Sequence, residues 1–546
     1  MSRHLLEVQD LGIAFETESG PVEVVRDVSL HVEAGEALVI LGESGSGKSV
    51  TSSAIMDLLD RPPAVITSGR ILFHGQDRLA MPPEAVRQMN GKKIAMIFQD
   101  PLAYLHPLYT IGHQITEAIR AHEPVGAREA WTQAVRLLER VGIPDAGRRA
   151  NQYPHQFSGG QRQRVMIAMA LVLKPELLIA DEPTTALDVT IQAQILKLLR
   201  ELCADLRMGL ILITHDLAVA AHMGDRVAVM QKGRIVETGP TREVFADPKH
   251  PYTRQLLDAV PNHEGAVVAP SRHDEPLLRV IDLVKDYHVP GGIGRRQVIH
   301  AVTGVSFEIR KGETLAIVGE SGSGKSTIAK LLMRLEEPTS GRATYRGADI
   351  FAMQGADLLK HRRRVQMVFQ DPYSSLNPNM RIGSIIAEPW TVHADILPRA
   401  EWPRRMEELL GLVGLEPEHA RRYPHQFSGG QRQRIAIARA LACDPELIIC
   451  DEAVSALDVS IQAQIIELLS ELRDRLGLAY IFISHDLEVV RSFADRVLVM
   501  KSGAFVEEGE VEALFTAPTQ PYTQALVTAT PKPKWEELPA SARQPA

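Results

Sequence analysis

Residues 37–49 read ALVILGESGSGKS, and residues 314–326 read TLAIVGESGSGKS. Each stretch is a short apolar run followed by a loop with the pattern G-x-x-x-x-G-K-[ST] and then by a helix-like segment. Apolar runs of this length predict buried parallel strands. Glycines let successive backbone N–H groups point at one centre, and the N-terminus of the following helix adds positive charge. The two stretches therefore predict two phosphate-binding loops.

The side chains of these loops predict nucleotide binding. Lys48 and Lys325 are expected to reach the β- and γ-phosphates, and Ser49 and Ser326 to ligate Mg²⁺. The expected nucleotide-binding residues are Gly42, Glu43, Ser44, Gly45, Ser46, Gly47, Lys48, Ser49 and Val50 in the first loop, and Gly319, Glu320, Ser321, Gly322, Ser323, Gly324, Lys325, Ser326 and Thr327 in the second.

The rest of the chain repeats in the same order. YPHQFSGGQRQR occurs at 153–164 and at 423–434, and the shorter blocks ALDV, HDL and PYT also occur twice. Each copy is long enough to bury its own core. The intervening segment is polar and contains proline, as linkers do. We expect a first domain at 1–262, a linker at 263–277, a second domain at 278–530 and a flexible tail at 531–546.

Other apolar runs, LLIA at 177–180 and LILI at 210–213, also predict buried strands, and residues 190–206 predict a helix. Short strands that alternate with helices predict an α/β fold with a mostly parallel sheet.

Two of the predicted strands end in a pair of acids. LLIADEP contains Asp181 and Glu182, and LIICDEA contains Asp451 and Glu452. The carboxyl edge of a parallel sheet is where α/β proteins bind ligands. We expect the aspartates to hold Mg²⁺, directly or through water. The glutamates are then placed to orient or deprotonate an attacking water.

The amino-acid composition argues against several classes of protein. The 546 residues include 60 Lys+Arg and 68 Asp+Glu, a net charge of −8, which disfavours a nucleic-acid-binding protein. The cysteines Cys203, Cys443 and Cys450 are too few for a disulfide framework and lack metal-ligand spacing, so we expect buried free thiols. The early charges of the N-terminus argue against a signal peptide, and no apolar run is long enough to span a membrane.

FSGGQ stands at 157–161 and at 427–431, and further residues accompany it in the same order in both halves. The ordered set resembles the ATP-binding subunit of an ATP-binding-cassette (ABC) transporter with two fused cassettes. The resemblance implies two tandem P-loop NTPase domains, each with a mostly parallel core sheet, an antiparallel β subdomain and a helical subdomain carrying the signature motif. The accompanying residues are Gln99, Asp188 and His215 in the first half and Gln370, Asp458 and His485 in the second.

The resemblance implies an ATPase that uses ATP and Mg²⁺. In this family the signature motif of one cassette closes over the ATP held by the other, head to tail. The signature residues are Ser158, Gly159, Gly160 and Gln161 in the first half and Ser428, Gly429, Gly430 and Gln431 in the second. Lys48, Glu182 and His215 would then share a site with Ser428, Gly430 and Gln431, and Lys325, Glu452 and His485 with Ser158, Gly160 and Gln161.

The family pattern also assigns roles to the other residues. His215 and His485 would contact the γ-phosphate region and act in catalysis with the lysines and glutamates. Gln99 and Gln370 would touch Mg²⁺ from loops that face membrane partners. Asp188 and Asp458 would line the nucleotide sites, and Phe15 and Tyr287 would stack on adenine.

Two segments point to a subgroup of the family. HPYTRQLLDAVP at 250–261 and QPYTQALVTATP at 520–531 resemble the C-terminal region of ATPases that serve oligopeptide, dipeptide and nickel importers. Fused pairs of this kind serve peptides, glutathione and related compounds. The resemblance implies two permease subunits and an external substrate-binding protein as partners, no nucleic acid, and a peripheral position on the cytoplasmic face of the inner membrane.

The sequence departs from the family pattern at a few positions. The first glutamine loop carries Tyr104 and His106, which leaves its permease contact open, and Ala453 replaces the usual proline after the second glutamate. Two other twin-cassette proteins remain as alternatives. One acts on ribosomes or DNA and usually has a long charged linker, coiled coil or zinc module; the other imports sugars, usually with one degraded site and no PYT segment.

Overall fold

The computed structural model describes residues 4–18, 20–185, 187–258, 275–291, 295–369, 375–455 and 457–530. The described residues up to 187 and from 191 to 258 form one compact unit, and those from 275 to 530 form a second. The tail predicted at 531–546 and most of the linker predicted at 263–277 lie outside the described residues. The second unit begins with a strand at Pro276, paired with Arg310, two residues before the predicted domain start.

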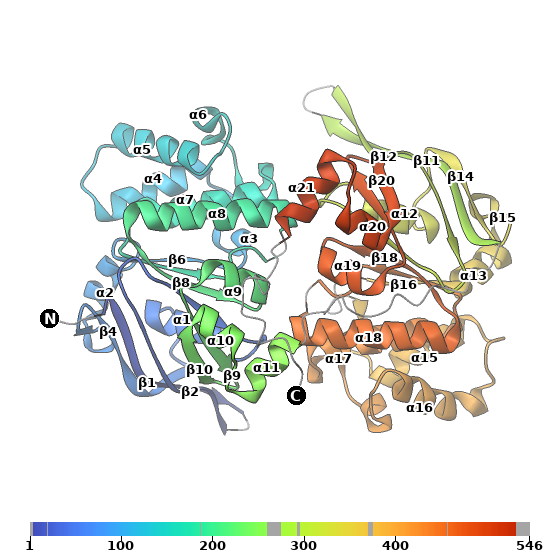
Figure 1. The fold of residues 1–546 in the computed structure, drawn as a ribbon, viewed down its shortest axis with the longest axis horizontal. Coiled ribbons are helices and arrows are strands. Elements are labelled where there is room, and N and C mark those ends of the chain that lie inside the picture. Colours follow the sequence, from blue (N-terminus) through green and yellow to red (C-terminus); the bar gives the residue numbers. More distant parts are fainter. Residues whose placement is uncertain are drawn as a thin grey trace. The chain divides into compact units, whose positions relative to one another are not determined.

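The first unit contains two sheets (Figure 1). A four-stranded sheet of order β2-β1-β4-β5 is antiparallel. A six-stranded sheet of order β10-β9-β3-β8-β7-β6 is parallel except for β10. The strands are β1 Leu6–Thr17, β2 Gly20–Val32, β3 Ala37–Leu41, β4 Ala64–Phe73, β5 Gln76–Asp77, β6 Ile94–Ile97, β7 Leu177–Asp181, β8 Gly209–Thr214, β9 Arg226–Gln231 and β10 Arg234–Pro240.

The parallel strands confirm the apolar-run predictions. β3, β7 and β8 contain the predicted strands 37–41, 177–180 and 210–213, and nearly every residue in them is buried because helices cover both faces of a parallel sheet. The register pairs Leu41 with Thr214 and Asp181 with Ile213. The carboxyl ends of these three strands therefore meet at one edge, where the candidate site lies.

Helices α4, α5 and α7 form a separate layer of the first unit, and α7 also contacts β6. In α5, Ala130, Ala134 and Leu138 recur every four residues and are buried, as an amphipathic helix requires. The predicted helix 190–206 is confirmed as α8. The helices are α1 Lys48–Met56, α2 Pro83–Met89, α3 Pro101–Tyr104, α4 Ile111–His122, α5 Ala127–Arg140, α6 Ala146–Arg149, α7 Gly159–Leu171, α8 Val189–Leu206, α9 Leu217–Met223, α10 Thr241–Ala246 and α11 Pro251–Asp258.

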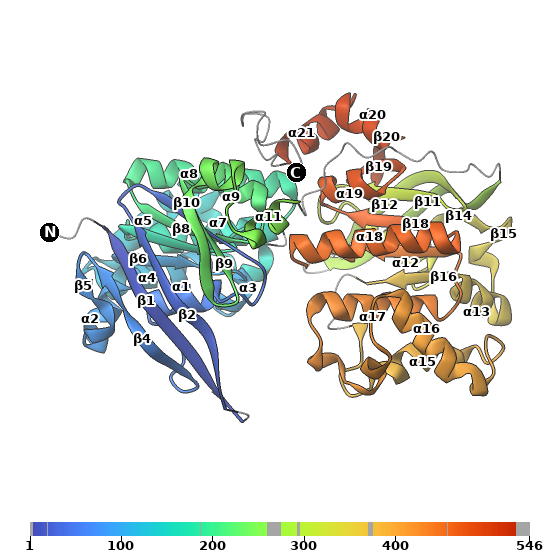
Figure 2. The same cartoon turned by 60° about the horizontal axis from the view of Figure 1, so that its bottom comes forward.

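The second unit repeats this architecture (Figure 2). Its sheets have the orders β12-β11-β14-β15 and β16-β17-β18-β13-β19-β20. The strands are β11 Pro276–Gly291, β12 Arg295–Arg310, β13 Thr314–Val318, β14 Ser340–Tyr345, β15 Ala348–Asp349, β16 Val365–Val368, β17 Leu447–Asp451, β18 Ala479–Ser484, β19 Arg496–Lys501 and β20 Ala504–Glu510. The helices are α12 Lys325–Leu332, α13 Gly355–Arg364, α15 Ile382–Val392, α16 Trp402–Leu412, α17 Gly429–Leu441, α18 Val459–Leu476, α19 Leu487–Phe493, α20 Val511–Thr516 and α21 Pro521–Ala529.

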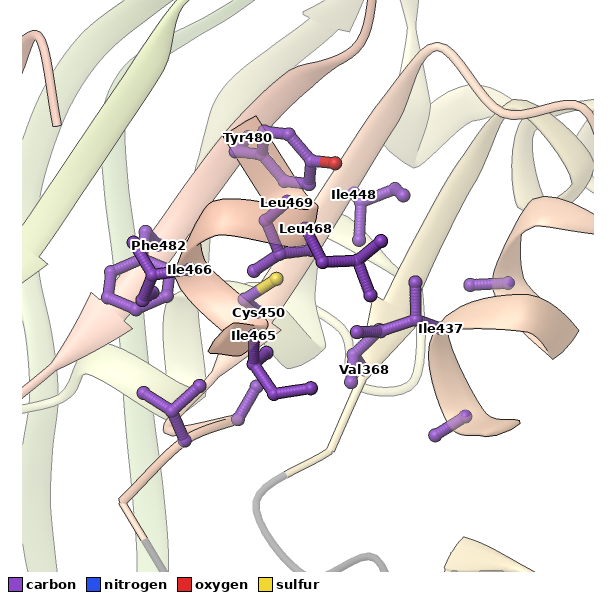
Figure 3. Close-up of a cluster of buried hydrophobic side chains, with 14 of the residues drawn as sticks. Val368, Ile437, Ile448, Cys450, Ile465, Ile466, Leu468, Leu469, Tyr480 and Phe482 are labelled. Carbon is purple, nitrogen blue, oxygen red and sulfur yellow. The ribbon is translucent and has the colours of Figure 1, made fainter. Parts of the chain in front are cut away.

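A cluster of buried side chains joins the sheet and helices of the second unit (Figure 3). Cys450 on β17 lies inside it with no exposed surface, beside Tyr480 and Phe482 of β18. Burial raises the pKa of Cys450 and Cys203 to about 12 and that of Cys443 to about 11. All three cysteines are buried free thiols, which confirms their expected state.

Replacing Phe482, which is fully buried, by alanine is expected to lower the free energy of unfolding of the second unit by about 3–5 kcal/mol. The loss combines the lost transfer free energy of the ring with the cavity that it leaves. Urea unfolding followed by circular dichroism measures the change. Leu476→Ala is the matched control, because Leu476 is 45% exposed, and it is expected to change stability by less than about 1 kcal/mol. Equal losses in the two variants would contradict the core position of Phe482.

Within the described part of the chain, no helix is both long enough and apolar enough to cross a membrane.

Candidate functional site

The first glycine-rich loop connects β3 to α1 and is shaped by close backbone contacts. A Cβ atom at Gly42 would lie 2.2 Å from the carbonyl oxygen of Met230, a distance that no real side chain adopts. Gly47 has a φ of 102°, which disfavours any residue with a side chain. In the second unit Gly319 stands in the same relation to Met500, at 2.1 Å. The glycines of the motif are therefore required by the fold of the loop.

The lysine of each loop is buried and folds back over it. Lys48 Nζ donates to the carbonyl oxygens of Gly42 and Glu43, both at 2.7 Å. Lys325 Nζ donates to those of Gly319 at 2.7 Å and of Glu320 at 2.9 Å. Burial lowers the pKa of Lys325 from its ordinary value. Each ammonium group is thus held at the loop where the sequence predicts the phosphates.

Gly42→Ala tests the shape of the loop. We expect it to weaken binding of an ATP analogue to the first unit at least about 10-fold, since the new methyl group collides with backbone rather than with a movable side chain. Gly126→Ala is the control, because a Cβ at Gly126 meets nothing within 4 Å. Isothermal titration calorimetry measures both. Unchanged affinity in the Gly42 variant would show that this close contact does not define the loop.

The predicted Mg²⁺ ligands meet in both units. Ser49 Oγ donates to Asp181 Oδ1 at 3.0 Å, and Ser326 Oγ donates to Asp451 Oδ1 at 2.8 Å. Burial raises the pKa of Asp181 to about 6, although the hydrogen bond from Ser49 opposes the shift, and burial raises the pKa of Asp451 as well. A buried carboxylate beside a hydroxyl is a donor set that suits Mg²⁺, which favours oxygen ligands.

The glutamates that follow the aspartates sit in strained backbone. Glu182 has a φ of 44° and Glu452 a φ of 49°, in the left-handed region that residues other than glycine rarely adopt. Their N–H groups donate to the carbonyls of Ile213 at 3.0 Å and of Ile483 at 2.9 Å. Such strain costs on the order of 1–3 kcal/mol and is concentrated at functional sites. Each glutamate directly follows the last residue of its strand, β7 or β17.

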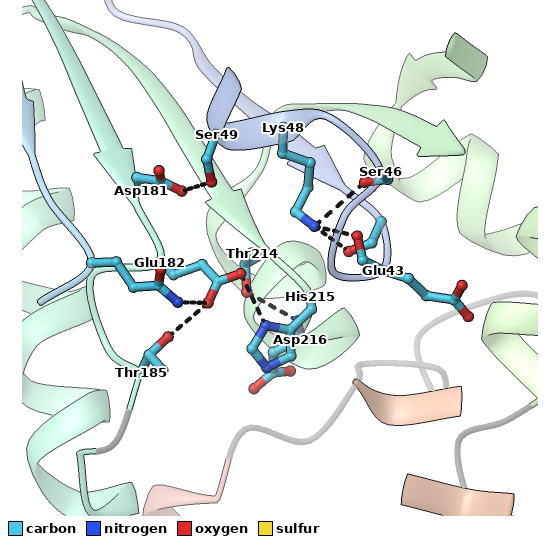
Figure 4. Close-up of polar contacts among 12 residues, drawn as sticks. Glu43, Ser46, Lys48, Ser49, Asp181, Glu182, Thr185, Thr214, His215 and Asp216 are labelled. Carbon is cyan, nitrogen blue, oxygen red and sulfur yellow. Dashed lines mark hydrogen bonds and ion pairs between the residues drawn. The ribbon is translucent and has the colours of Figure 1, made fainter. Parts of the chain in front are cut away.

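The Glu182 carboxylate contacts three side chains, two of them predicted from the sequence and one a near neighbour in the chain (Figure 4). Its Oε1 lies 3.3 Å from His215 Nδ1, and its Oε2 accepts from Gln99 Nε2 at 2.8 Å and from Thr185 Oγ1 at 3.0 Å. Burial opposes ionisation of Glu182, but its contacts with His215, then Thr185 and Lys48, together lower its pKa. Sequence reasoning missed Thr185, whose position three residues after Glu182 was the available signal.

The second unit forms the same acid–histidine pair. His485 Nδ1 lies 3.7 Å from Glu452 Oε2. Burial opposes charging of both groups, yet their mutual attraction raises the pKa of His485 and lowers that of Glu452. Contact within the pair therefore favours the charged form of both groups. Gln370, the counterpart of Gln99, lies outside the described residues.

The signature motif opens a helix in each unit. Ser158 caps α7: its Oγ accepts from the N–H of Gln161 at 3.4 Å, and Gln161 Oε1 accepts from the N–H of Ser158 at 3.2 Å. Ser428 and Gln431 form the same capping box on α17. A Cβ at Gly160 would lie 2.5 Å from Ile191, and one at Gly430 2.3 Å from Ile461, so both glycines are needed for close helix packing. Gly159 and Gly429 are the first residues of α7 and α17.

The remaining predicted residues lie as follows. Asp188 directly precedes α8, and Asp458 is at the N-cap position of α18. Phe15 is partly buried against the core of the first unit. The hydroxyl of Tyr287 donates to Glu336, and Lys285 Nζ lies 5.0 Å from the centroid of the Tyr287 ring. Contact of either ring with adenine stays a prediction.

A further group came from the structure alone. His4, His31 and Glu33 have potential metal-ligating atoms within 4.8 Å of one another. His4 Nδ1 already pairs with Glu33 Oε1 at 2.6 Å. Burial and then the charge of Arg226 lower the pKa of His31, so a cation is already close to this group. These contacts favour an ion pair over a metal site.

Comparison with known proteins agrees with the geometry. The ABC transporter family model matches residues 25–185 and 302–455. The chain belongs to the ABC transporter family. The oligopeptide/dipeptide transporter C-terminal region matches residues 236–275 and 506–546, which contain the two PYT segments.

Similar proteins include two named glutathione import ATP-binding protein GsiA. The one from Pectobacterium atrosepticum is 47% identical over 560 residues, covering 97% of this chain and 90% of that protein. The one from Escherichia coli K12 is 47% identical over 559 residues with the same coverage. A solved ABC cassette bound to ADP and phosphate is 31% identical and covers 43% of this chain and 98% of that one, with a TM-score of 0.39.

These findings confirm the family and the fold predicted from the sequence. As an ABC ATP-binding protein the chain binds nucleotide and is an ATPase, the ATP-hydrolysing subunit of an importer that works with membrane permeases.

Proposed function

We propose that the two cassettes, at 1–262 and 278–530, pair within one chain and form two composite ATP sites. Each site takes its P-loop, acids and histidine from one cassette and its signature helix from the other. The single observation that carries the proposal is that both units have the complete set: the loop lysine, the serine–aspartate pair, the glutamate–histidine pair and a capped signature helix.

Different residues are assigned to binding the phosphates and to holding Mg²⁺. Lys48 and Lys325 bind the β- and γ-phosphates and balance their charge. Ser49 with Asp181, and Ser326 with Asp451, would hold Mg²⁺, which supplies further neutralisation of charge on the phosphates.

The ionised glutamates orient the attacking water and accept its proton. Glu182 and Glu452 are suited to this because histidine contact keeps them charged in spite of burial. His215 and His485 hold the carboxylates in place and face the γ-phosphate region. The N-terminal N–H groups of α7 and α17 favour an anion, and we assign them to the γ-phosphate bound by the opposite cassette.

The cargo we propose is glutathione or another short peptide. The support is the 47% identity to glutathione import proteins and the match of both PYT regions to oligopeptide/dipeptide transporters. This match also favours a peptide importer over the sugar importer and over a cassette protein of ribosomes or DNA. We further propose two permeases, an external binding protein and a peripheral position on the cytoplasmic face of the membrane.

The first cassette offers a candidate permease contact. Phe98 and Tyr104 stack with ring centroids 3.8 Å apart, and Leu102 and Leu108 nearby are exposed. Apolar side chains held at the surface are typical of protein interfaces. The departure at Tyr104 therefore places an exposed aromatic side chain where the second loop has Ser375.

A thermal-shift screen of the partner binding protein tests the cargo. We expect glutathione or a short peptide to raise its melting temperature, since a ligand that binds only the folded state stabilises it. ATP-dependent uptake of the same compound into vesicles that contain the whole transporter is the second readout. Stabilisation by a sugar and by no peptide would contradict the proposed cargo.

A further inference from the structure

The C-terminal segment of each cassette touches its own glycine-rich loop through one tyrosine. The Tyr252 hydroxyl accepts a hydrogen bond from the backbone N–H of Glu43 at 3.3 Å. The Tyr522 hydroxyl accepts one from the N–H of Glu320 at 3.2 Å. Both tyrosines belong to the PYT blocks. The same contact formed twice, by chain segments some 200 residues apart, is a feature of the repeated fold.

Each tyrosine lies in the first turn of a helix, and a glutamate fixes the start of that helix by accepting backbone hydrogen bonds. Glu237 of β10 accepts from the N–H groups of Lys249 at 2.8 Å and His250 at 3.1 Å, directly before α11. Glu507 of β20 accepts from the N–H groups of Thr519 at 2.7 Å and Gln520 at 3.1 Å, directly before α21. Proline then occupies the first position of each helix, where its missing N–H costs nothing. Tyr252 follows with only 5% of its surface exposed.

The hydrogen bond fixes a particular peptide group. The N–H of Glu43 and the carbonyl of Gly42 belong to one peptide unit, and that carbonyl accepts from Lys48 Nζ at 2.7 Å. Because a peptide unit is planar, holding its N–H also fixes the direction of its carbonyl. The peptide unit is therefore held at its N–H by Tyr252 and at its carbonyl oxygen by Lys48.

The second cassette repeats this arrangement. The peptide unit between Gly319 and Glu320 donates its N–H to Tyr522, and its carbonyl accepts from Lys325 Nζ at 2.7 Å. Burial raises the pKa of Tyr522 to about 12, so the hydroxyl stays neutral and the contact persists at physiological pH. Lys501 Nζ also lies 4.7 Å from the centroid of the Tyr522 ring.

We propose that Tyr252 and Tyr522 are positioning residues of the ATP sites, each orienting the peptide group that seats the P-loop lysine. The C-terminal PYT segment is then part of the nucleotide site. This inference rests on the proposed use of the loops as ATP sites. Loss of the hydroxyl leaves the Glu43 or Glu320 N–H without this partner and frees the peptide group to turn, which loosens the lysine and weakens ATP binding.

The test is the double variant Tyr252→Phe/Tyr522→Phe in the full chain, which removes only the two hydroxyl groups. Isothermal titration calorimetry with Mg²⁺ and a non-hydrolysable ATP analogue measures the dissociation constant. We expect an increase of about three- to tenfold, the equivalent of one lost hydrogen bond per site. Tyr345→Phe is the matched control: its buried hydroxyl bonds Glu446 away from the loop, so the dissociation constant should not change.

Three outcomes would overturn the inference, and each has a different meaning. In the first, the double tyrosine variant binds the analogue with wild-type affinity while Lys48→Ala/Lys325→Ala loses binding. That result would show that the tyrosines serve only in packing, and it would leave the proposed ATP sites intact. No binding of the analogue by the wild-type chain would overturn the proposed function as well. An equal loss of affinity in Tyr345→Phe would also count against positioning, since it would reflect general destabilisation.

Discussion

ATP turnover is expected to fall about 100-fold or more when Glu182 and Glu452 are both replaced by glutamine. Glutamine keeps the size of the side chain but cannot accept the proton of the attacking water. The P-loops, lysines and serine–aspartate pairs remain, so ATP should still bind. Phosphate release by the assembled transporter measures turnover, and calorimetry on the same protein confirms that ATP binding persists.

The single variants Glu182→Gln and Glu452→Gln test whether both sites work. Each unit has a glutamate–histidine pair, so we expect both single variants to lose turnover and transport. Glu201→Gln, an exposed position on α8, is the control and should retain activity. Wild-type turnover and transport in either single active-site variant would contradict two hydrolysing sites.

Replacing Lys48 and Lys325 together by alanine is expected to weaken ATP binding about 10- to 100-fold, because each loses charge-assisted contacts to the phosphates. Both lysines are buried, and both are held by loop carbonyls. Binding of a fluorescent ATP analogue measures the change. Lys197→Ala, whose side chain is 76% exposed, is the control.

Circular dichroism separates this effect from unfolding. If the double lysine variant is folded and binds the analogue as tightly as the wild type, the P-loops are not the phosphate sites. If the exposed-lysine control loses affinity to the same extent, the loss reflects net charge rather than the loops.

The fold was predictable from the sequence wherever a local pattern decides structure. The apolar runs at 37–41, 177–180 and 210–213 are strands because buried parallel strands need such runs on both faces. The spacing of the glycines and the lysine predicts the phosphate-binding loop. The position of Asp181 and Glu182 directly after an apolar run places both acids at the carboxyl edge of the sheet. These features come from residues adjacent in sequence.

The contacts that sequence reasoning missed join distant residues or depend on backbone angles. The bond between Tyr252 and Glu43 spans 209 positions and follows no periodicity. The left-handed φ of Glu182 arises where strand β7 ends, in a residue type that gives no hint of it. The grouping of His4 with Glu33 arises only when β1 and β2 pair. Such contacts require the folded structure.

The measurement that most directly tests paired cassettes counts bound nucleotides in double variants. In the Glu182→Gln/Glu452→Gln background, Lys48→Ala with Ser428→Arg damages the same composite site twice. Lys48→Ala with Ser158→Arg damages both sites. Two changes at one site should remove only one bound ATP, whereas changes at separate sites should have additive effects and remove two.

We predict one tightly bound ATP per chain for the Lys48/Ser428 combination and none for the Lys48/Ser158 combination, as counted by equilibrium dialysis with labelled ATP. The reverse pattern, with one bound ATP for Lys48/Ser158 and none for Lys48/Ser428, would contradict the head-to-tail account.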